Sequence, residues 1–254
     1  MHAINSARIR NARVMKIIIV KDYEEMSQKA AEIVSEQLKA KPDSVIGFAT
    51  GSTPIGLYKN LIEKYENGEI SFSKVTTVNL DEYVGLAWDN EQSYNYFMNH
   101  NLFDHIDVDR HNVNIPNGRP NGLYAECVRY MDKLASLKQD IQILGIGSNG
   151  HIGFNEPGTR FKSVTHIVEL TESTIADNSR LFDAISEVPR MAITMGISEI
   201  MNAKHILVLA NGENKAEAVY KMIKGEVTEA CPASVLQNHP NCTVIVDEKA
   251  AKLL

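Results

Sequence analysis

The 254-residue sequence has only three cysteines and one tryptophan, and it has no long hydrophobic run. The cysteines are scattered and odd in number, which argues against both a disulfide framework and a metal site. No apolar stretch approaches the roughly 20 residues of a membrane-spanning helix, so no membrane partner is expected. The formal charge of −6 contains no block of like charges, which argues against nucleic-acid binding. These absences predict a soluble cytoplasmic protein without a nucleic-acid or membrane partner.

Residues 1–14, MHAINSARIRNARV, have no hydrophobic stretch of signal-peptide length. We expect them to be an artificial or disordered leader, because the strand-like run MKIIIV begins at Met15. Residues 15–254 are expected to form a single domain, since this length is common for α/β domains. No internal repeat or linker divides them.

Short β-branched runs alternate with helix-like patterns along most of the chain. The runs predicted to be strands are 16–20, 44–50, 75–80, 141–147, 191–195, 205–210 and 243–247. The patterns predicted to be helices are about 23–38, 54–67, 92–103, 121–138, 172–186 and 213–224. This alternation predicts an α/β fold with a mainly parallel sheet and helices on both faces. Such a sheet binds ligands at the carboxyl ends of its strands, where the strand order reverses.

The first informative strand end is Thr50-Gly51-Ser52-Thr53, followed by Pro54. Gly51 allows a tight turn, and we expect Thr53 to cap the next helix. The free N–H groups and the dipole of that helix favour an anion. The stretch lacks the lysine and spacing of a Walker loop, and an ordinary strand-to-helix turn is the competing interpretation.

A second strand end carries two adjacent carboxylates, Asp81 and Glu82. Neighbouring side chains point to opposite sides of an extended backbone, so only one can face the ligand crevice. Asp81 lies nearer the strand and is the candidate general base. The alternative is a carboxylate that only caps a helix or a turn.

The stretch 144–158, LGIGSNGHIGFNEPG, contains the Gly-x-Gly-x-x-Gly spacing of a dinucleotide site. That site needs a long helix after its third glycine, which the early Pro157 makes unlikely. We expect instead a compact loop that presents Asn149, His151 and Glu156. The carboxylate can orient the imidazole for proton transfer, whereas a buried core histidine is the alternative.

Two basic residues, Arg180 and Lys215, complete the candidate site. Each has an ordinary explanation as a surface or helix-start residue. Two cations beside a helix N-terminus nevertheless suit a phosphate dianion. Together the strand ends point to a phosphorylated small molecule that undergoes proton transfer.

The motifs GFATGSTPIGLY, VNLDEYVGL and LGIGSNGHIGFNEPG, in this order, resemble those of the glucosamine-6-phosphate deaminase (isomerase) family, and NSR and NGENKA fit as well. The resemblance extends from Met15 to the C-terminus. It implies a modified Rossmann-like fold that converts glucosamine 6-phosphate and water to fructose 6-phosphate and ammonia. It also implies that no metal, nucleotide or organic cofactor is needed.

The resemblance assigns a role to each candidate residue. The residues implied to bind the sugar phosphate are Thr50, Gly51, Ser52, Thr53, Arg180 and Lys215. The residues implied in catalysis are Asp81, Asn149, His151 and Glu156. In this scheme His151 opens the pyranose ring with the help of Glu156 and the residue at position 149. Asp81 then moves the C2 proton to C1.

Two departures from the family pattern affect what the resemblance implies. Asn149 stands where the hexameric members carry aspartate, so it can orient His151 but carries no charge. His166 and Val168 stand where the allosteric members carry an Arg-x-Lys pair, and the C-terminal helix is shorter. We therefore expect a monomer without the allosteric amino-sugar-phosphate site.

Three other functions are compatible with parts of the pattern. A 6-phosphogluconolactonase-like hydrolase needs no base at C2, so VNLDEYVGL favours the deaminase. A non-catalytic sugar-phosphate-sensing module is expected to carry a DNA-binding segment, which does not precede Met15. An inactive binding protein is disfavoured because Asp81, His151 and Glu156 are all present. The polar segment at about 159–187 is interpreted either as a lid over the substrate or as a rigid subdomain.

Overall fold

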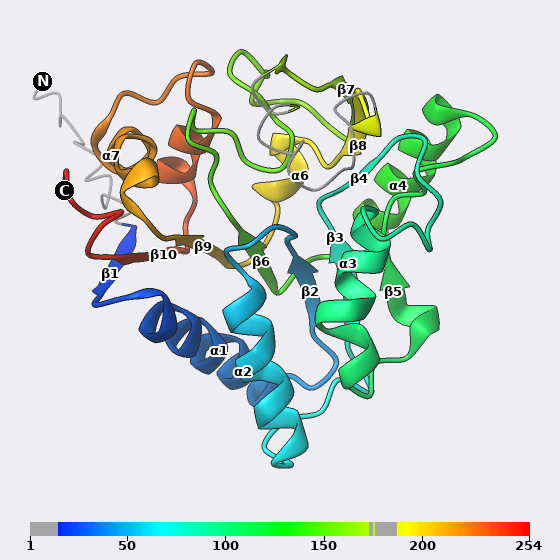
Figure 1. The fold of residues 1–254 in the computed structure, drawn as a ribbon, viewed down its shortest axis with the longest axis horizontal. Helices are drawn as coiled ribbons and strands as arrows, with labels where there is room; N and C mark the ends of the chain where they lie inside the picture. Colours follow the sequence, from blue (N-terminus) through cyan, green and yellow to red (C-terminus); the bar gives the residue numbers. More distant parts are fainter. Residues whose placement is uncertain (1–14, 173–174, 176–186) are drawn as a thin grey trace, which may run out of the picture.

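The main sheet has seven parallel strands in the order β1-β10-β9-β6-β2-β3-β5 (Figure 1). The computed structural model describes residues 15–172, 175 and 187–254. The strands of this sheet are β1 (Lys16–Val20), β2 (Val45–Phe48), β3 (Thr76–Asn79), β5 (Val113–Asn114), β6 (Ile141–Leu144), β9 (Ile206–Ala210) and β10 (Cys242–Asp247). Six of the seven predicted strands lie in it, which confirms the mainly parallel α/β fold.

Helices cover both faces of the sheet. They are α1 (Tyr23–Ala40), α2 (Ile55–Glu66), α3 (Tyr94–Asn101), α4 (Leu123–Ser136), the short α6 (Ile197–Ile200) and α7 (Ala216–Lys224). Crossover connections between parallel strands are right-handed as a rule. The chain moves across the sheet in one direction through α1, α2 and α3 and in the opposite direction through α4 and α7, so these two groups of helices cover opposite faces. Five of the predicted helices are confirmed. The sixth, at 172–186, lies almost entirely outside the described residues, as do the leader 1–14 and Arg180.

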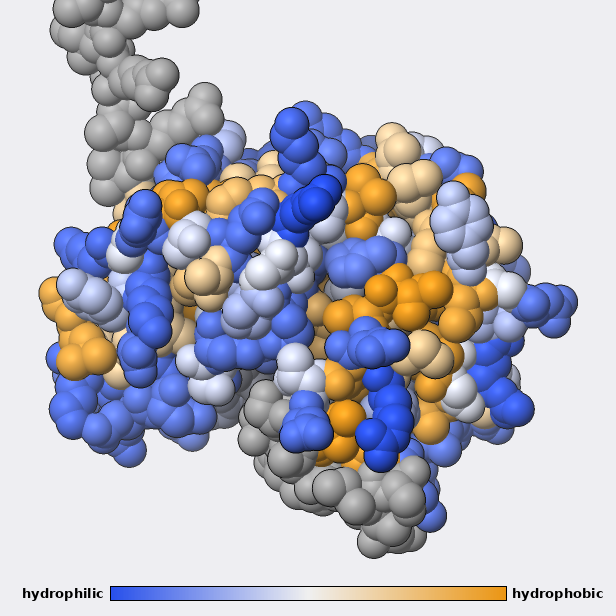
Figure 2. Space-filling view, turned by 90° about the horizontal axis from the view of Figure 1, so that it is seen from above, coloured by the Kyte–Doolittle hydropathy of each residue, from blue (hydrophilic) through white to orange (hydrophobic). Residues whose placement is uncertain are grey.

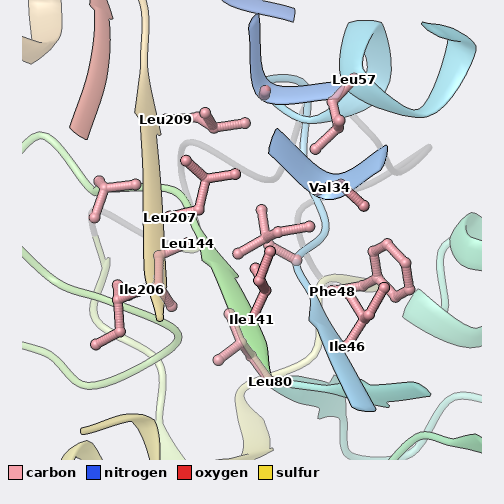
Figure 3. Packing of buried hydrophobic residues seen from close by; sticks show 14 of the residues in the cluster. Val34, Ile46, Phe48, Leu57, Leu80, Ile141, Leu144, Ile206, Leu207 and Leu209 are labelled. Atoms are coloured by element: carbon pink, nitrogen blue, oxygen red, sulfur yellow. The ribbon is translucent and has the colours of Figure 1, made fainter. Parts of the chain in front are cut away.

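The core of the domain lies between the central strands and the helices. Val34 of α1 and Leu57 of α2 are fully buried over the sheet, where Ile46 of β2 and Leu207 of β9 are fully buried as well (Figure 3). Burying each such side chain stabilises the fold by about 1.5–3 kcal/mol. This packing holds the central strands rigidly, so the loops that follow them start from well-defined positions.

A second, antiparallel sheet lies beyond β3. Its order is β4-β8-β7, from β4 (Asp81–Tyr83), β8 (Met191–Thr194) and β7 (His166–Glu169). The predicted strand at 191–195 is therefore real, but its place in the parallel sheet was wrong. An apolar run does not reveal its partners, and here β8 pairs with β4 after the chain has left the main sheet. β7 escaped prediction because its residues are only half-buried or exposed.

The strand order reverses between β2 and β6. From β2 the chain continues outward to β3 and β5, whereas β6, β9 and β10 add on the other side. A crevice at such a reversal, outside the carboxyl ends of the strands, is where open α/β sheets bind ligands. The predicted Thr50–Thr53 turn follows β2 and the predicted loop 144–158 follows β6, so the fold brings both to this point. In the described part of the chain, no helix is long and apolar enough to cross a membrane.

Candidate active site

A cavity of about 270 Å³ opens at the point where the strand order reverses. Figure 2 looks from above onto this edge, where hydrophobic residues gather right of centre and hydrophilic ones cover most of the left. The predicted site residues that line the cavity are Thr50, Gly51, Ser52, Thr53, Asp81, His151 and Lys215. Asn149 and Glu156 do not line it, but both contact His151. The structure thus brings together the predicted residues that it describes.

The Thr50–Thr53 turn presents unused backbone donors to the cavity. Gly51 adopts a φ of 96°, which only glycine reaches without strain. Among the described residues, the N–H groups of Gly51, Ser52 and Thr53 find no protein acceptor. Three N–H groups without an acceptor at the start of α2, beside the cavity, could bind an anion.

The capping expected of Thr53 was wrong. α2 begins after Pro54 and has no side-chain cap from within the turn. The hydroxyl of Tyr23 takes that place: it accepts the N–H of Gly56 at 2.7 Å and donates to the carbonyl of Ser52 at 3.1 Å. Thr53 lies one position too early and donates its hydroxyl to Oδ1 of Asn211 at 3.2 Å. Tyr23 belongs to α1, so only the tertiary fold reveals its role.

Only one of the two adjacent carboxylates faces the cavity, as predicted. Asp81 lines the cavity and is 6 % exposed. Glu82 points the other way and accepts the N–H groups of Tyr83, Tyr94 and Asn95 at 2.8–2.9 Å. The helix-capping interpretation therefore applies to Glu82, while Asp81 is left facing the ligand space.

Burial raises the pKa of both carboxyl groups. Desolvation, with a smaller contribution from the charge of Glu82, raises the pKa of Asp81 to about 8. Desolvation likewise raises the pKa of Glu82 to about 7, although its three N–H bonds oppose the shift. With a pKa of about 8, the carboxyl of Asp81 is mostly protonated at neutral pH. A positive charge nearby, such as an ammonium group of a ligand, favours its carboxylate form.

Tyr94, in the first turn of α3, lines the cavity and had no sequence signal. Its side chain bonds to those of Thr50 and Tyr83, and its ring lies parallel to that of Phe154 with centroids 6.0 Å apart. The sequence marks Ser93 as a helix start but cannot show which way the next residue points. Tyr94 therefore links the anion site to the wall beside Asp81.

His151 belongs to a polar triad held within the loop after β6. Its Nδ1 lies 3.5 Å from Oε1 of Glu156, and its backbone N–H donates to Oδ1 of Asn149 at 3.1 Å. Asn149 in turn donates from Nδ2 to Oε2 of Glu156 at 2.7 Å. The carboxylate faces one ring nitrogen and leaves the other side of the imidazole for the cavity, the arrangement expected of a proton shuttle. The loop contains no helix, so the dinucleotide interpretation is excluded.

Gly147 makes room for the His151 ring. A β-carbon on Gly147 would lie 2.3–2.6 Å from three atoms of the imidazole. The ring therefore rests flat against this glycine. Within the Gly-x-Gly-x-x-Gly motif, Gly147 thus makes room for the histidine, whereas a β-carbon on Gly150 would meet Sγ of Cys231.

Lys215 closes the other end of the cavity. It ends the short 3₁₀ turn η4 (Glu213–Lys215) after β9, as the Asn-Gly-x-x-Lys pattern predicted. Within residues 15–172, 175 and 187–254, no three His, Cys, Asp or Glu side chains gather in a way that could hold a metal ion. The chemistry available to these residues is anion binding at one end and proton transfer at the other.

Comparison with known proteins places this arrangement in one family. The family described as "Glucosamine-6-phosphate isomerases/6-phosphogluconolactonase" matches residues 21–245. The chain is 56% identical over 241 residues to glucosamine-6-phosphate deaminase of Thermoanaerobacter pseudethanolicus, covering 94% of this chain and 95% of that protein. It is 53% identical to the deaminase of Clostridium perfringens, covering 94% and 100%.

Solved structures agree with the sequence relatives. A monomeric glucosamine-6-phosphate deaminase superposes with a TM-score of 0.93 at 50% identity, covering 94% of this chain and 100% of that one. The 6-phosphogluconolactonase of Trypanosoma brucei shares the fold, with a TM-score of 0.78 at 21% identity over 94% and 98% of the two chains. The modified Rossmann-like fold implied by the motifs is thereby confirmed. The chain belongs to the family of glucosamine-6-phosphate isomerases and 6-phosphogluconolactonases.

Proposed function

We propose that this chain is an isomerising deaminase that converts glucosamine 6-phosphate and water to fructose 6-phosphate and ammonia. One observation carries the proposal. One cavity is lined by the Thr50–Thr53 turn, whose backbone N–H groups have no acceptor among the described residues, by Lys215, by the buried carboxyl of Asp81 and by His151, whose Nδ1 lies 3.5 Å from Glu156. The relatives at 53–56% identity, which are glucosamine-6-phosphate deaminases by name, support the same reaction.

The phosphate group binds at the Thr50–Thr53 turn. The N–H groups of Gly51, Ser52 and Thr53 donate to its oxygens, and Lys215 supplies a positive charge from the opposite side. Arg180 is proposed as the second cation on the strength of the family motif alone. This anchoring orients the sugar, so that its C1 and C2 lie toward Asp81 and His151.

His151 opens the pyranose ring. The imidazole takes the proton of the anomeric hydroxyl and returns a proton to the ring oxygen as the C1–O5 bond breaks, which leaves the open-chain aldehyde. Glu156, 3.5 Å from Nδ1, stabilises the imidazolium formed in between. Asn149 fixes both partners through its two hydrogen bonds.

Asp81 then moves one proton between neighbouring carbons. Its carboxylate removes the proton from C2 while the ammonium group passes a proton to the C1 oxygen, which forms an enolamine, and the same carboxyl group then delivers its proton to C1. The resulting C2 iminium adds water, and the carbinolamine expels ammonia to leave the C2 ketone. The substrate's own ammonium group, which lies on C2, favours the carboxylate form of Asp81 before this step.

Asp81 distinguishes this reaction from lactone hydrolysis. Hydrolysis of a sugar-phosphate lactone requires a base for water but no group that reaches C2. A buried carboxyl that faces the cavity beside the anion site suits the isomerisation. The likeness to the lactonase, at 21% identity, concerns the fold only.

We further infer that the enzyme works as a monomer in the cytoplasm, without an allosteric site. The solved relative at 50% identity is a monomeric deaminase, which supports the first part. His166 and Val168, at the positions of the Arg-x-Lys pair, lie on β7 and offer no such pair of cations. The lid at about 159–187 remains a prediction.

The test measures both products at once. Purified protein with glucosamine 6-phosphate is expected to release ammonia and fructose 6-phosphate in equal amounts, and the Asp81→Asn variant is expected to release neither. A parallel assay offers 6-phosphogluconolactone. Lactone hydrolysis without deamination would replace the proposal by the hydrolase, and binding of both sugars without any product would replace it by a sensing module.

A further inference from the structure

The two halves of the phosphate site come from strands that are not neighbours. The Thr50–Thr53 turn follows β2 and the Lys215 turn follows β9, while β6 lies between these strands. Strand pairing alone therefore does not set the distance between the two turns. One side-chain contact joins them directly: the hydroxyl of Thr53 donates to Oδ1 of Asn211 at 3.2 Å.

The turn that carries Asn211 and Lys215 is itself held from β10. The carboxylate of Asp247, the last residue of β10, accepts the N–H of Gly212 with both oxygens at 3.0 Å. The carbonyl of Gly212 accepts the N–H of Lys215 at 3.1 Å. Asp247 is only 6 % exposed, so water competes little for its oxygens. The backbone of Lys215 is thus fixed through Gly212 to a buried carboxylate.

We propose that Asn211 and Asp247 are positioning residues that set the affinity of the phosphate site, an inference that rests on the proposed function of that site. Neither residue lines the cavity. Asn211 acts through Thr53 and Asp247 acts through Gly212 and Lys215. Together they hold a backbone N–H donor and a cation at the separation that one phosphate group needs.

The contact also decides what Thr53 contributes. Its hydroxyl proton is committed to Asn211, so Thr53 offers the phosphate its backbone N–H and not its hydroxyl proton. The Asn211–Thr53 contact and the Asp247–Gly212 contact both end at the turns proposed to bind phosphate, and neither involves Asp81. Their loss should therefore weaken ground-state and transition-state binding equally, which raises KM and leaves kcat unchanged.

The experiment compares four variants in the full chain. Asn211→Ala removes the contact with Thr53, and Asp247→Ala removes the contact with Gly212. Asp247→Asn keeps one acceptor oxygen, which Gly212 and the N–H of Ala250 can share. Glu213→Gln is the matched control: it removes one charge on the same turn, but that side chain is exposed and its ion-pair partner among the described residues is Lys252 at the surface. Steady-state kinetics, the Kd of inorganic phosphate by calorimetry and thermal unfolding are measured for each.

A neutral hydrogen bond contributes about 1 kcal/mol, or roughly fivefold in an equilibrium constant. We expect KM and the phosphate Kd to rise about fivefold in Asn211→Ala and about tenfold or more in Asp247→Ala. Asp247→Asn should fall between Asp247→Ala and the wild type, and Glu213→Gln should stay within about twofold. The value of kcat should be retained in all four.

Unchanged KM and phosphate Kd in Asn211→Ala and Asp247→Ala would overturn the inference. A loss of kcat at constant KM would also overturn it. Equal increases of KM in Asp247→Asn and Glu213→Gln would do so as well, because they would show that the charge of the turn sets the affinity and not the position of its residues. If the Asp247 variants unfold, Asn211→Ala decides alone. The phosphate Kd does not depend on turnover, so wild-type protein that binds phosphate but releases no ammonia would refute the deaminase and leave this test standing.

Discussion

Replacing Gly147 by alanine should displace the imidazole that opens the sugar ring. The added β-carbon would lie 2.3 Å from Cε1, 2.4 Å from Nδ1 and 2.6 Å from Cγ of His151. Non-bonded carbon atoms need about 3.5 Å or more, so the ring has to move by roughly 1 Å. A misplacement of about 1 Å in a catalytic group can cost roughly 100-fold in rate. We expect kcat of Gly147→Ala to fall by about that factor.

The fold itself should tolerate the change, because the His151 side chain is 25% exposed and can turn toward solvent. Thermal unfolding should therefore shift little, and inorganic phosphate should bind as in the wild type. Gly145→Ala is the matched control. A methyl group there also narrows the cavity, but it meets no atom within 4 Å. The assay is the initial rate of ammonia release at saturating substrate. Equal losses of kcat in the two variants, or full activity in Gly147→Ala, would refute the reasoning.

Three further changes test charges at and away from the site. Because burial raises the pKa of Asp81 to about 8, its carboxylate forms only as pH rises through that value, so kcat/KM should climb through about pH 8; a limb near pH 4 would contradict this. Glu82→Gln removes a neighbouring charge that raises the same pKa, so the limb should move to lower pH in the same profile. Asp140→Asn should lower the free energy of unfolding by about 1–2 kcal/mol at neutral pH, because its buried carboxylate bonds to the partly exposed Lys41 and Lys204. Burial alone would raise the pKa of Asp140, but its hydrogen bonds outweigh burial and lower that pKa. The loss of stability in Asp140→Asn should therefore be present above about pH 4 and disappear as the pH falls below that value, as measured by denaturant unfolding at each pH.

The elements that could be predicted are those whose signal is local. β2, β6, β9 and β10 are short apolar runs that are almost wholly buried, and β1 is an apolar run at the largely exposed edge of the sheet. Such short apolar runs can be recognised in a single sequence. The site loops were found for the same reason: each polar or glycine-rich cluster follows a buried strand directly. Parallel strands end at one edge of a sheet, so placing the clusters on strand ends was enough to bring them together.

What could not be predicted depends on pairing between distant residues. Tyr23 caps a helix that begins 32 positions later in the chain, by accepting from Gly56 and donating to Ser52. β8 joins β4 in an antiparallel sheet through pairs such as Thr194 with Asp81. Nothing in the spacing of these residues records such contacts, since they arise only when the main sheet has set the elements side by side. The same pairing carries Asp81 away from the end of β3 and into a strand of its own.

Asn149 shows why a neutral amide suits this particular loop. It donates to Glu156 at 2.7 Å and accepts from the backbone of His151 at 3.1 Å, so both halves of the amide are used. An aspartate in the same place could accept from His151 but would set two carboxylate oxygens 2.7 Å apart, which requires a proton between them. The amide supplies that hydrogen itself. Glu156 then faces Nδ1 of His151 at 3.5 Å in one fixed orientation.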